Sequence, residues 1–432
     1  MGFLRLTGFI VLLAVGVRIY YQPQNPLFPN PLKSALPEHF GGEVDARFKR
    51  VENEFRQMFR DGWEAQGAAV AVYYNNKLVV DIWGGYADEH AMRPWTRDTL
   101  TTVFSATKAV TALALANLVD KGHMRYDDLV SKYWPEFAQN GKDNITVKIL
   151  AGHQAGISCT EPQVTLEDIA DWRRMGAILE KEKPRWPAGT RFGYHALTHG
   201  WLADQLIRRV DPKKRSIGQY IQEELIKPTG SEELYVGLPV ELDHRVTRLH
   251  EAGPLDGFMH LISDWNFFKM LWPYFTGQLT PLAKKTFFEP DWLLAPIHSG
   301  GNPFNNPDVR RVEIAAANGI ATARGLAQPF NALVNGKVVS KKTIDVIKEP
   351  MWIKEVDYVM GARMSGGLGF AYTPSPKNDT WLVGHPGHGG QNVKVDFKHK
   401  LAFAYVTNSL KLGMGDVTRT FKRIQNAIYD CV

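Results

Sequence analysis

The two ends of the sequence carry mirrored helix and strand patterns, and this mirroring limits the possible folds more than any other feature. Near the N-terminus, apolar residues recur at helical spacing over residues 45–63. Strand-like runs follow at 68–74 and 78–83, and residues 75–77 (Asn-Asn-Lys) between them are typical of a hairpin turn. This segment predicts a helix followed by two antiparallel strands.

The C-terminal end repeats the arrangement in reverse order. Strand-like runs at 393–397 and 401–406 flank a Lys-His-Lys turn at 398–400, and a helical pattern over 417–429 closes the chain. We therefore expect one antiparallel sheet built from both ends, with one face covered by the two terminal helices. The long middle is mostly helical in pattern, so the predicted class is α/β (α+β) with an all-helical subdomain.

Composition and charge exclude several classes of protein. Hydrophobic residues make up 44% of the 432 residues and charged residues 22%, which argues against a disordered chain, a collagen and a polytopic membrane protein. The net charge of +6 is spread along the chain, so we expect no nucleic-acid partner. Cys159 and Cys431 are too few for a disulfide framework or a zinc site made of cysteines.

The N-terminus predicts a membrane anchor and a tether. An apolar run at 8–17 lies between Arg5 and Arg18, so residues 1–22 are interpreted as a retained signal anchor. A cleaved signal peptide, which would make the protein secreted, and a mitochondrial presequence remain alternatives. Residues 23–44 are rich in proline and predict an extended tether, and residues 45–432 predict the catalytic domain.

A serine and a lysine stand together at the start of the most apolar segment. Ser105 and Lys108 form an S-x-x-K tetrad, and residues 109–119 are almost wholly apolar, which predicts a buried helix. Ser105 could be only a helix N-cap. Lys108 lies on the same helix face one turn later, where a buried amine needs a partner or a lowered pKa. A neutral lysine beside a serine hydroxyl is the arrangement that activates a nucleophile.

Two further segments could carry chemistry. Tyr194 follows a Pro-Ala-Gly turn at 187–189 and precedes a helical pattern, although a lone tyrosine is usually a core residue. The glycine-rich run 384–390 (Gly-His-Pro-Gly-His-Gly-Gly) stands directly before the strand at 393, and glycines there would let a substrate approach the backbone. Without that role, the run would be a tight turn.

These cues, in this order, resemble the serine β-lactamase and penicillin-binding-protein superfamily, and in particular class C β-lactamases and their esterase relatives. The resemblance runs from about residue 48 to 428 and implies a β-lactamase/transpeptidase-like fold. Supporting stretches lie at 99–110, 145–157 and 318–327. His153, in the second of these stretches, is expected to hold a loop by hydrogen bonds.

The resemblance assigns roles to individual residues. Ser105 would be the acylated nucleophile, Lys108 its base, and Tyr194 the tyrosine that shares the proton transfer. His385 and Gly387 would occupy the place of the family's Lys-Thr-Gly. The backbone N–H groups of Ser105 and His388 would form the oxyanion hole, although the neighbouring glycines leave room for a shift in register at His388.

The sequence departs from the family pattern at two positions. The family's Tyr-x-Asn becomes Tyr194-His195-Ala196, and the lysine of Lys-Thr-Gly becomes His385. With an ordinary pKa of about 6.5, His385 would be mostly neutral at pH 7, and its help with an anionic substrate would fade as the pH rises. Both departures favour an esterase-like or peptidase-like site over efficient β-lactam hydrolysis.

We therefore expect a serine hydrolase that forms an acyl-enzyme with an ester or amide of a small molecule or peptide and needs no cofactor. His195 and His199 stand at helical spacing, but no glutamate accompanies them, so we expect no metal site. A catalytically silent scaffold or assembly protein that keeps the fold is the alternative.

Overall fold

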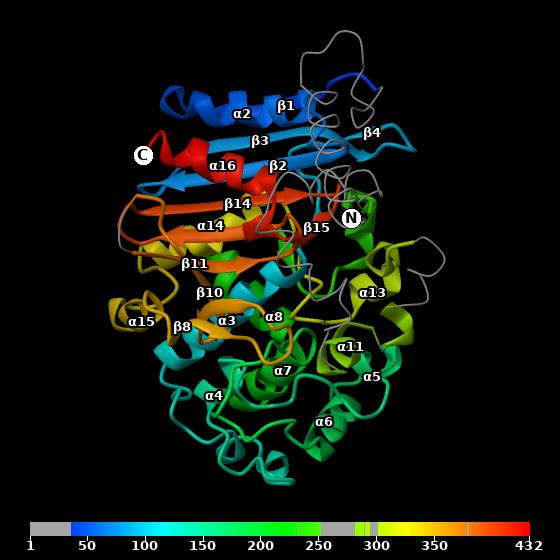
Figure 1. Cartoon of the computed structure of the whole chain (residues 1–432), viewed down its shortest axis with the longest axis vertical. Coiled ribbons are helices and arrows are strands. Elements are labelled where there is room, and N and C mark those ends of the chain that lie inside the picture. The colour runs from blue at the N-terminus through cyan, green and yellow to red at the C-terminus, as the bar shows by residue number, and fades with distance from the viewer. Residues whose placement is uncertain (1–35, 232, 252–280, 289, 294–300, 378–379) are drawn as a thin grey trace, which may run out of the picture.

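One antiparallel sheet joins the two ends of the chain. A computed structural model describes residues 36–231, 233–251, 281–288, 290–293, 301–377 and 380–432 (Figure 1). Within them, the strands of the main sheet follow the order β1-β3-β2-β14-β13-β11-β10-β9-β8, and β4 pairs with β3. Their bounds are β1 Phe40–Val44, β2 Gly67–Tyr74, β3 Lys77–Asp88, β4 Arg93–Pro94, β8 Trp352–Val356, β9 Arg363–Gly367, β10 Phe370–Pro374, β11 Trp381–Pro386, β13 Asn392–Asp396 and β14 Leu401–Thr407.

The contact between β2 and β14 confirms that both ends build the sheet. The two strands are antiparallel, with Tyr74 opposite Leu401 and Ala68 opposite Thr407. The hairpin from β2 to β3 turns at Asn75 and Asn76, whose φ angles of 49° and 64° lie in the left-handed region that asparagine tolerates. Residues 40–44, predicted as part of the tether, pair with β3 as β1, so the folded part begins before residue 45.

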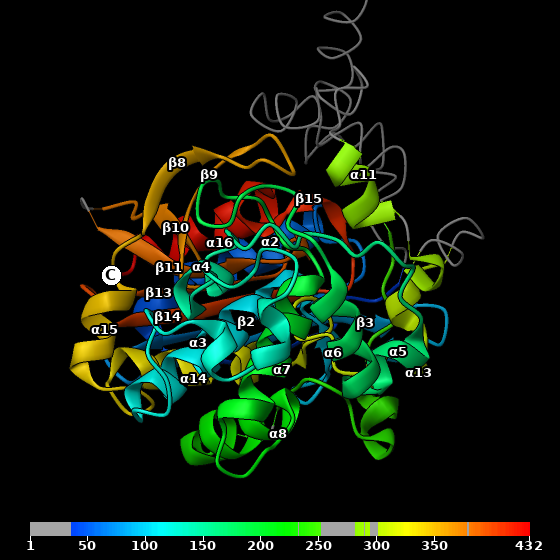
Figure 2. The same ribbon diagram turned by 90° about the horizontal axis from the view of Figure 1, so that it is seen from below.

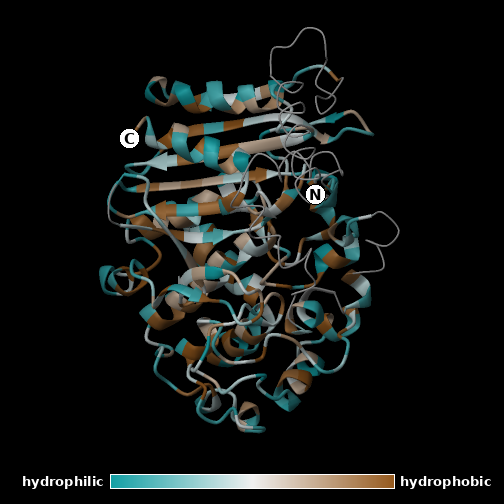
Figure 3. Ribbon diagram, in the orientation of Figure 1, coloured by the Kyte–Doolittle hydropathy of each residue, from teal (hydrophilic) through white to brown (hydrophobic). Residues whose placement is uncertain are grey.

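The two terminal helices cover one face of the sheet, as the sequence predicts (Figure 1). These helices are α2 (Lys49–Arg60) and α16 (Arg419–Tyr429). Apolar side chains on one side of each helix pack into a shared core cluster with side chains of β2, β3 and β14. Figure 3 shows the matching alternation of hydrophilic and hydrophobic segments along both helices. Arg423 on α16 contacts Glu54 and Asp61 and so ties the two helices together.

The helical half packs against the opposite face. Its remaining helices are α3 Thr107–Asp120, α4 Val147–Ala151, α5 Leu166–Ala170, α6 Trp172–Lys181, α7 Thr198–Val210, α8 Ile217–Ile221, α11 Pro281–Phe288, α13 Pro307–Arg311, α14 Ala323–Val334 and α15 Lys341–Ile347. Helix α3 contacts β10 and β11 as well as α7 and α8, so it lies between the sheet and the other helices (Figure 2). Every residue of α3 from Thr107 to Leu118 is buried, as its apolar sequence predicts.

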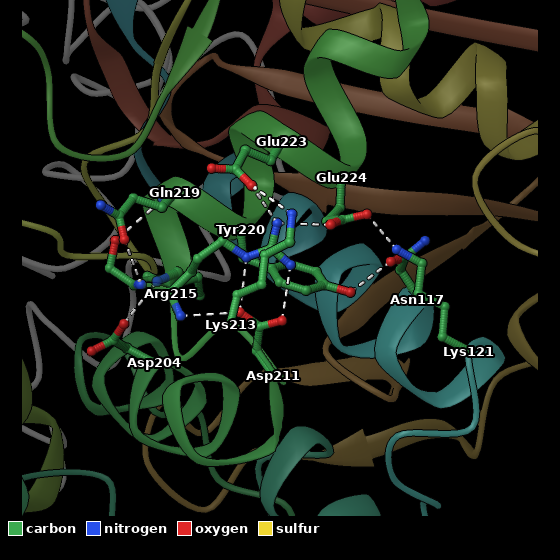
Figure 4. A network of polar contacts seen from close by, with 12 residues as sticks. Asn117, Lys121, Asp204, Asp211, Lys213, Arg215, Gln219, Tyr220, Glu223 and Glu224 are labelled. Atoms are coloured by element: carbon green, nitrogen blue, oxygen red, sulfur yellow. Dashed lines mark hydrogen bonds and ion pairs between the residues drawn. The ribbon is translucent and has the colours of Figure 1, made fainter.

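An ion-pair network fixes the far end of α3 (Figure 4). Arg215, just before α8, donates to both carboxylate oxygens of Asp211 at 2.8 Å and also contacts Glu223 and Glu224 at 2.6 and 2.7 Å. Tyr220 of α8 donates its hydroxyl hydrogen to Asn117 Oδ1 of α3 at 2.6 Å. The network therefore holds α8 and the π-helix Gln222–Ile226 against the helix that begins beside Ser105.

The structure does not support the predicted membrane localisation. The predicted signal anchor, residues 1–22, lies outside the described residues. Among the helices of the described part of the chain, none combines the length and the apolar character that crossing a membrane requires. The apolar run at 8–17 that suggested the anchor is only about half of the ~20 residues that a spanning helix needs. The predicted membrane anchor, and the membrane as a partner, are therefore not supported.

Arg215→Ala should destabilise the fold, because it leaves the carboxylate of Asp211 buried without its ion partner. Removing one member of a buried pair costs on the order of 3 kcal/mol, or about 4 °C in the midpoint of thermal unfolding for a chain of this size. Lys213→Ala is the matched control, because Lys213 reaches Glu223 at 3.4 Å with 65% of its side chain exposed. Equal midpoints for the two variants would contradict the role given to this network.

The loss should also depend on pH. Burial alone would raise the pKa of Asp211, but its hydrogen bonds and ion pair with Arg215 outweigh this effect and lower the pKa to about 2, below the unfolded value of about 3.9. Asp211 therefore contributes stability above pH 4 that is lost as the pH falls toward 2. The difference between the midpoints of wild type and Arg215→Ala should shrink over that interval, and a constant difference down to pH 2 would contradict this assignment.

Candidate active site

Ser105 stands on a strained turn at the start of α3. The turn is a 3-10 helix, Phe104–Ala106, in which Phe104 has a φ of 46°, in the left-handed region that large side chains rarely adopt. Thr107 holds this turn, since its hydroxyl donates to the Phe104 carbonyl at 2.5 Å and accepts from the Gly319 N–H at 2.8 Å. The strain is stored at a single residue next to Ser105, as is common where a fold presents a reactive group.

Lys108 is fully buried, and its amine faces Ser105. Nζ lies 3.4 Å from Ser105 Oγ and donates to the carbonyl oxygens of Ala196 and Ala316 at 2.7 and 2.8 Å. Burial lowers the pKa of Lys108 well below its ordinary value, which favours the neutral amine. A neutral amine has two hydrogens and one lone pair. In the neutral form, both hydrogens are donated to the two carbonyl oxygens, so the lone pair of Nζ points toward Ser105.

Tyr194 completes the contact from the loop before α7. Its hydroxyl lies 2.7 Å from Ser105 Oγ, and its ring lies under the Lys108 amine, 4.6 Å from Nζ to the ring centroid. Burial raises the pKa of Tyr194, so the phenol keeps its hydrogen at neutral pH and can donate it to Ser105. The hydroxyl hydrogen of Ser105 is then directed to Lys108.

His153 and His195 hold the loop that carries Tyr194. The N–H groups of Gly193 and His195 donate to the carbonyl oxygen and to Nδ1 of His153 at 3.0 and 3.2 Å. Nε2 of His195 accepts from the Ile157 N–H at 3.0 Å. These bonds are of the loop-holding kind that the sequence predicts for His153. In the described part of the chain, no group of three His, Cys, Asp or Glu side chains is arranged to hold a metal ion.

His385 lies at the end of β11 with its ring stacked on that of Tyr194, at 6.0 Å between centroids and 28° between planes. Its Nδ1 lies 2.7 Å from the Pro386 carbonyl oxygen, which makes Nδ1 the protonated nitrogen of a neutral ring. Burial, helped by the nearby Lys108, lowers the pKa of His385 well below its ordinary value. The expectation of an ordinary pKa near 6.5 for His385 is therefore wrong, because an ordinary value does not apply to a buried ring.

Gly387 lets β11 approach the turn that presents Ser105. A Cβ atom at this position would lie 2.4 Å from the Val103 carbonyl oxygen and 3.3 Å from the Ala106 nitrogen, so any side chain would push the strand away. This close contact places the predicted substrate-binding run 384–390 beside the start of α3.

His388 follows in the short strand β12 (His388–Gly389), which pairs with β15 (Lys411–Met414). His388 is opposite Met414, and the Gly415 N–H donates to the Gly387 carbonyl at 2.9 Å. The His388–Met414 pair is therefore a non-hydrogen-bonded one, and the His388 N–H points away from β15. Its side chain is 48% exposed and packs edge-on against Phe104, with 5.3 Å between ring centroids.

The structure brings together the residues that the sequence singles out. Ser105, Lys108 and Tyr194 are in mutual contact, His385 stacks on Tyr194, and Gly387 packs against the turn before α3. Sequence analysis missed the carbonyl groups of Ala196 and Ala316, which orient the lysine. Both are main-chain groups, so no side-chain type marks them in the sequence.

Comparisons with known proteins agree with this geometry. The beta-lactamase family matches residues 55–427. The chain is 32% identical over 376 residues to "Esterase/beta-lactamase LipL" of Mycobacterium tuberculosis, covering 85% of this chain and 83% of that protein. It is also similar to the crystal structure of a family VIII carboxylesterase (TM-score 0.78, 30% identity) and to that of a penicillin-binding protein homologue from Caulobacter crescentus (TM-score 0.76, 32% identity). Each of these two structural alignments covers 91% of this chain and 100% of the matched protein. The predicted family and fold are confirmed.

Proposed function

We propose that this chain, which belongs to the beta-lactamase family and is a serine hydrolase of ester or amide bonds, acts chiefly on small esters without a negative charge. The observation that carries the preference for uncharged esters is His385, a buried neutral ring where the family has a lysine. The names of the similar proteins, an esterase/beta-lactamase and a carboxylesterase, support esters as substrates.

In the proposed acylation step, Ser105 Oγ attacks the ester carbonyl carbon and gives its proton to the lone pair of Lys108 Nζ. The carbonyl π electrons move to the oxygen, which becomes an oxyanion. When the oxyanion collapses, the bond to the alkoxy oxygen breaks, and this oxygen takes the proton of the Tyr194 hydroxyl. The ammonium of Lys108 then returns a proton to Tyr194, so both groups regain their starting forms.

Deacylation repeats the sequence with water. A water molecule loses a proton to Lys108 and attacks the acyl carbon, and Ser105 Oγ leaves with a proton from Tyr194. In both steps the N–H groups of Ser105 and His388 would hold the oxyanion. The position of Ser105 in the first helical turn and the direction of the His388 N–H away from β15 support this assignment. One such donor contributes about 2.7–4 kcal/mol in other enzymes.

Substrate preference follows from the charges at the site. Lys108 donates hydrogen bonds to two carbonyl oxygens, and its lowered pKa favours the neutral amine. His385 is buried and neutral. Neither offers a fixed cation to a substrate carboxylate. Ala196 supplies no side-chain amide to bind the acyl amide of a β-lactam. An ester with an apolar acyl group requires neither contact.

The catalytically silent scaffold is the weaker interpretation. Burying the Lys108 amine beside a serine, with no carboxylate partner in the described segments, is costly, and a scaffold would not need this pair. The contact of Ser105 with both Lys108 and Tyr194, together with the hydrolase names among the relatives, favours an active enzyme.

Ser105→Ala should abolish both ester turnover and covalent labelling by a fluorophosphonate, because only an activated serine is labelled. The midpoint of thermal unfolding should stay within a few degrees, because even a capping serine contributes only about 1 kcal/mol and Ser105 does not cap α3. Ser340→Ala, at the start of α15, is the control that should keep full labelling. Labelling of a folded Ser105→Ala protein would rule out this nucleophile.

Lys108→Ala should lose both acylation and deacylation, because no other base is proposed for Ser105. Tyr194→Phe keeps the ring and should lower kcat by about 10²–10⁴-fold, the usual effect of one positioned proton-transfer group. Because burial lowers the pKa of Lys108, kcat/KM in the wild type should reach its plateau at a pH well below 10.5. Stopped-flow kinetics with an aryl ester measures all three; a wild-type kcat in Tyr194→Phe would make Tyr194 a core residue only.

The native enzyme should hydrolyse short-chain aryl esters much faster than cephalosporins. Ala196→Asn combined with His385→Lys restores the family pattern and should raise the ratio of β-lactam to ester turnover. Each single variant serves as a control for the other, and kcat/KM on both substrates is the measurement. Faster native hydrolysis of a cephalosporin than of an aryl ester would contradict the substrate preference while leaving the serine chemistry intact.

A further inference from the structure

Asp357 reaches the main chain of Tyr194 from a distant part of the sequence. It lies in the turn between β8 and β9, and its Oδ1 accepts the N–H of Tyr194 at 3.1 Å. The same oxygen accepts the N–H groups of Val359 and Met360 at 2.8 and 3.0 Å. One carboxylate oxygen therefore joins the turn of the β8–β9 hairpin to the loop that carries the tyrosine.

The burial of Asp357 shows that this contact is a costly one. The residue is fully buried, and within the described part of the chain its Oδ2 has no hydrogen-bond partner. Burial raises the pKa of Asp357, although the three N–H donors favour the charged carboxylate. If the side chain at this position only filled space, an apolar residue would cost less free energy to bury. The acceptor oxygen is the property of aspartate that this position uses.

A second contact makes the junction rigid. The N–H of Tyr358 donates to the Phe192 carbonyl at 2.9 Å. Asp357 and Tyr358 therefore bind the loop through the residues on either side of Gly193. The ring of Phe192 also packs on Trp352 of β8, with 4.9 Å between centroids. Together with the bonds from His153 on the opposite side, these contacts leave the backbone of Tyr194 little freedom to move.

We infer that Asp357 is a positioning residue for Tyr194, holding its backbone so that its hydroxyl stays within hydrogen-bond distance of Ser105 Oγ. The inference rests on the proposed role of Tyr194 in proton transfer. A proton-transfer group must lie within about 2.6–3.2 Å of its partner, and a displacement of about 1 Å can cost on the order of 10²-fold in rate. Asp357 acts on the reaction only through Tyr194.

The test compares Asp357→Ala with Asp357→Asn in the full chain. The alanine variant removes the acceptor and should lower kcat for an aryl ester by about 10–100-fold, with KM changed less than about threefold. The asparagine variant keeps a carbonyl oxygen in place and should restore most of kcat. Should the alanine variant fail to fold, Asp357→Ser, whose hydroxyl ends about one bond short of the three N–H groups, replaces it with the same expected loss.

Asp396→Ala is the matched structural control. Asp396 is also fully buried and accepts the N–H groups of Lys398 and His399 in a turn, at 3.0 and 3.1 Å, but at the end of β13 away from His385. Its loss should lower the midpoint of thermal unfolding and leave kcat unchanged. A wild-type kcat in the folded Asp357→Ala or Asp357→Ser protein, with a lowered midpoint like that of the control, would overturn the inference.

A double-mutant cycle separates this inference from the proposed role of Tyr194. If Asp357 acts through the tyrosine hydroxyl, Asp357→Ala should have little further effect on kcat in a Tyr194→Phe background. If the two losses in kcat multiply in the double variant, Asp357 acts elsewhere than through Tyr194, and the inference fails. A wild-type kcat in Tyr194→Phe alone would instead remove the proposed role of Tyr194. A slow Tyr194→Phe with a normal Asp357→Ala would remove only the inference.

Discussion

Lys108 is buried and, among the residues that the structure describes, has no carboxylate partner; the rest of this site depends on that constraint. Three other lysines of the described residues are buried. Lys394 and Lys411 contact Asp416 and Glu64 at 3.0 and 2.9 Å, and Lys142 donates to the main-chain carbonyl oxygens of Glu180 and Glu182. Lys108, like Lys142, donates to two carbonyl oxygens, but its amine also contacts the hydroxyl of Ser105, and burial favours its neutral form. A neutral amine that is held in one orientation is a base, whereas a paired ammonium is a structural cation.

The position of the base depends on the assembly of the helical half around α3. The Ala196 carbonyl comes from the loop before α7, and the Ala316 carbonyl comes from the segment before β7 (Ile320–Ala321). The lysine therefore gains its orientation only when both segments pack on the start of α3. The sheet supplies the other side of the site through β11, since Gly387 packs against the turn before Ser105. The catalytic groups lie at the junction of the sheet and the helical half because each half contributes only some of them.

The sequence predicts local elements and motifs, but it does not reveal contacts between residues that lie far apart in the chain. Hydrophobic spacing is enough to find β2, β14 and the terminal helices, and the S-x-x-K tetrad before an apolar helix is enough to find Ser105 and Lys108. The carbonyls that orient Lys108, the burial of His385 and the bond from Asp357 to Tyr194 are not predictable in this way. They join segments up to 208 residues apart, and two of the groups are main-chain atoms that every residue type possesses. The apolar run at 8–17 is too short to distinguish a membrane-spanning segment from another role.

The two departures from the family pattern have a common electrostatic basis. Burial is the main cause of the lowered pKa of His385, and a protonated Lys108 would lower it further; by reciprocity, a cation at position 385 would lower the pKa of Lys108. A lysine there would add a second ammonium to a buried site that already disfavours the first. A neutral histidine avoids this repulsion, so that burial alone tunes the base. The same neutrality removes the attraction for a substrate carboxylate, and the acid–base balance of the site and its proposed preference for uncharged esters therefore follow from one side chain.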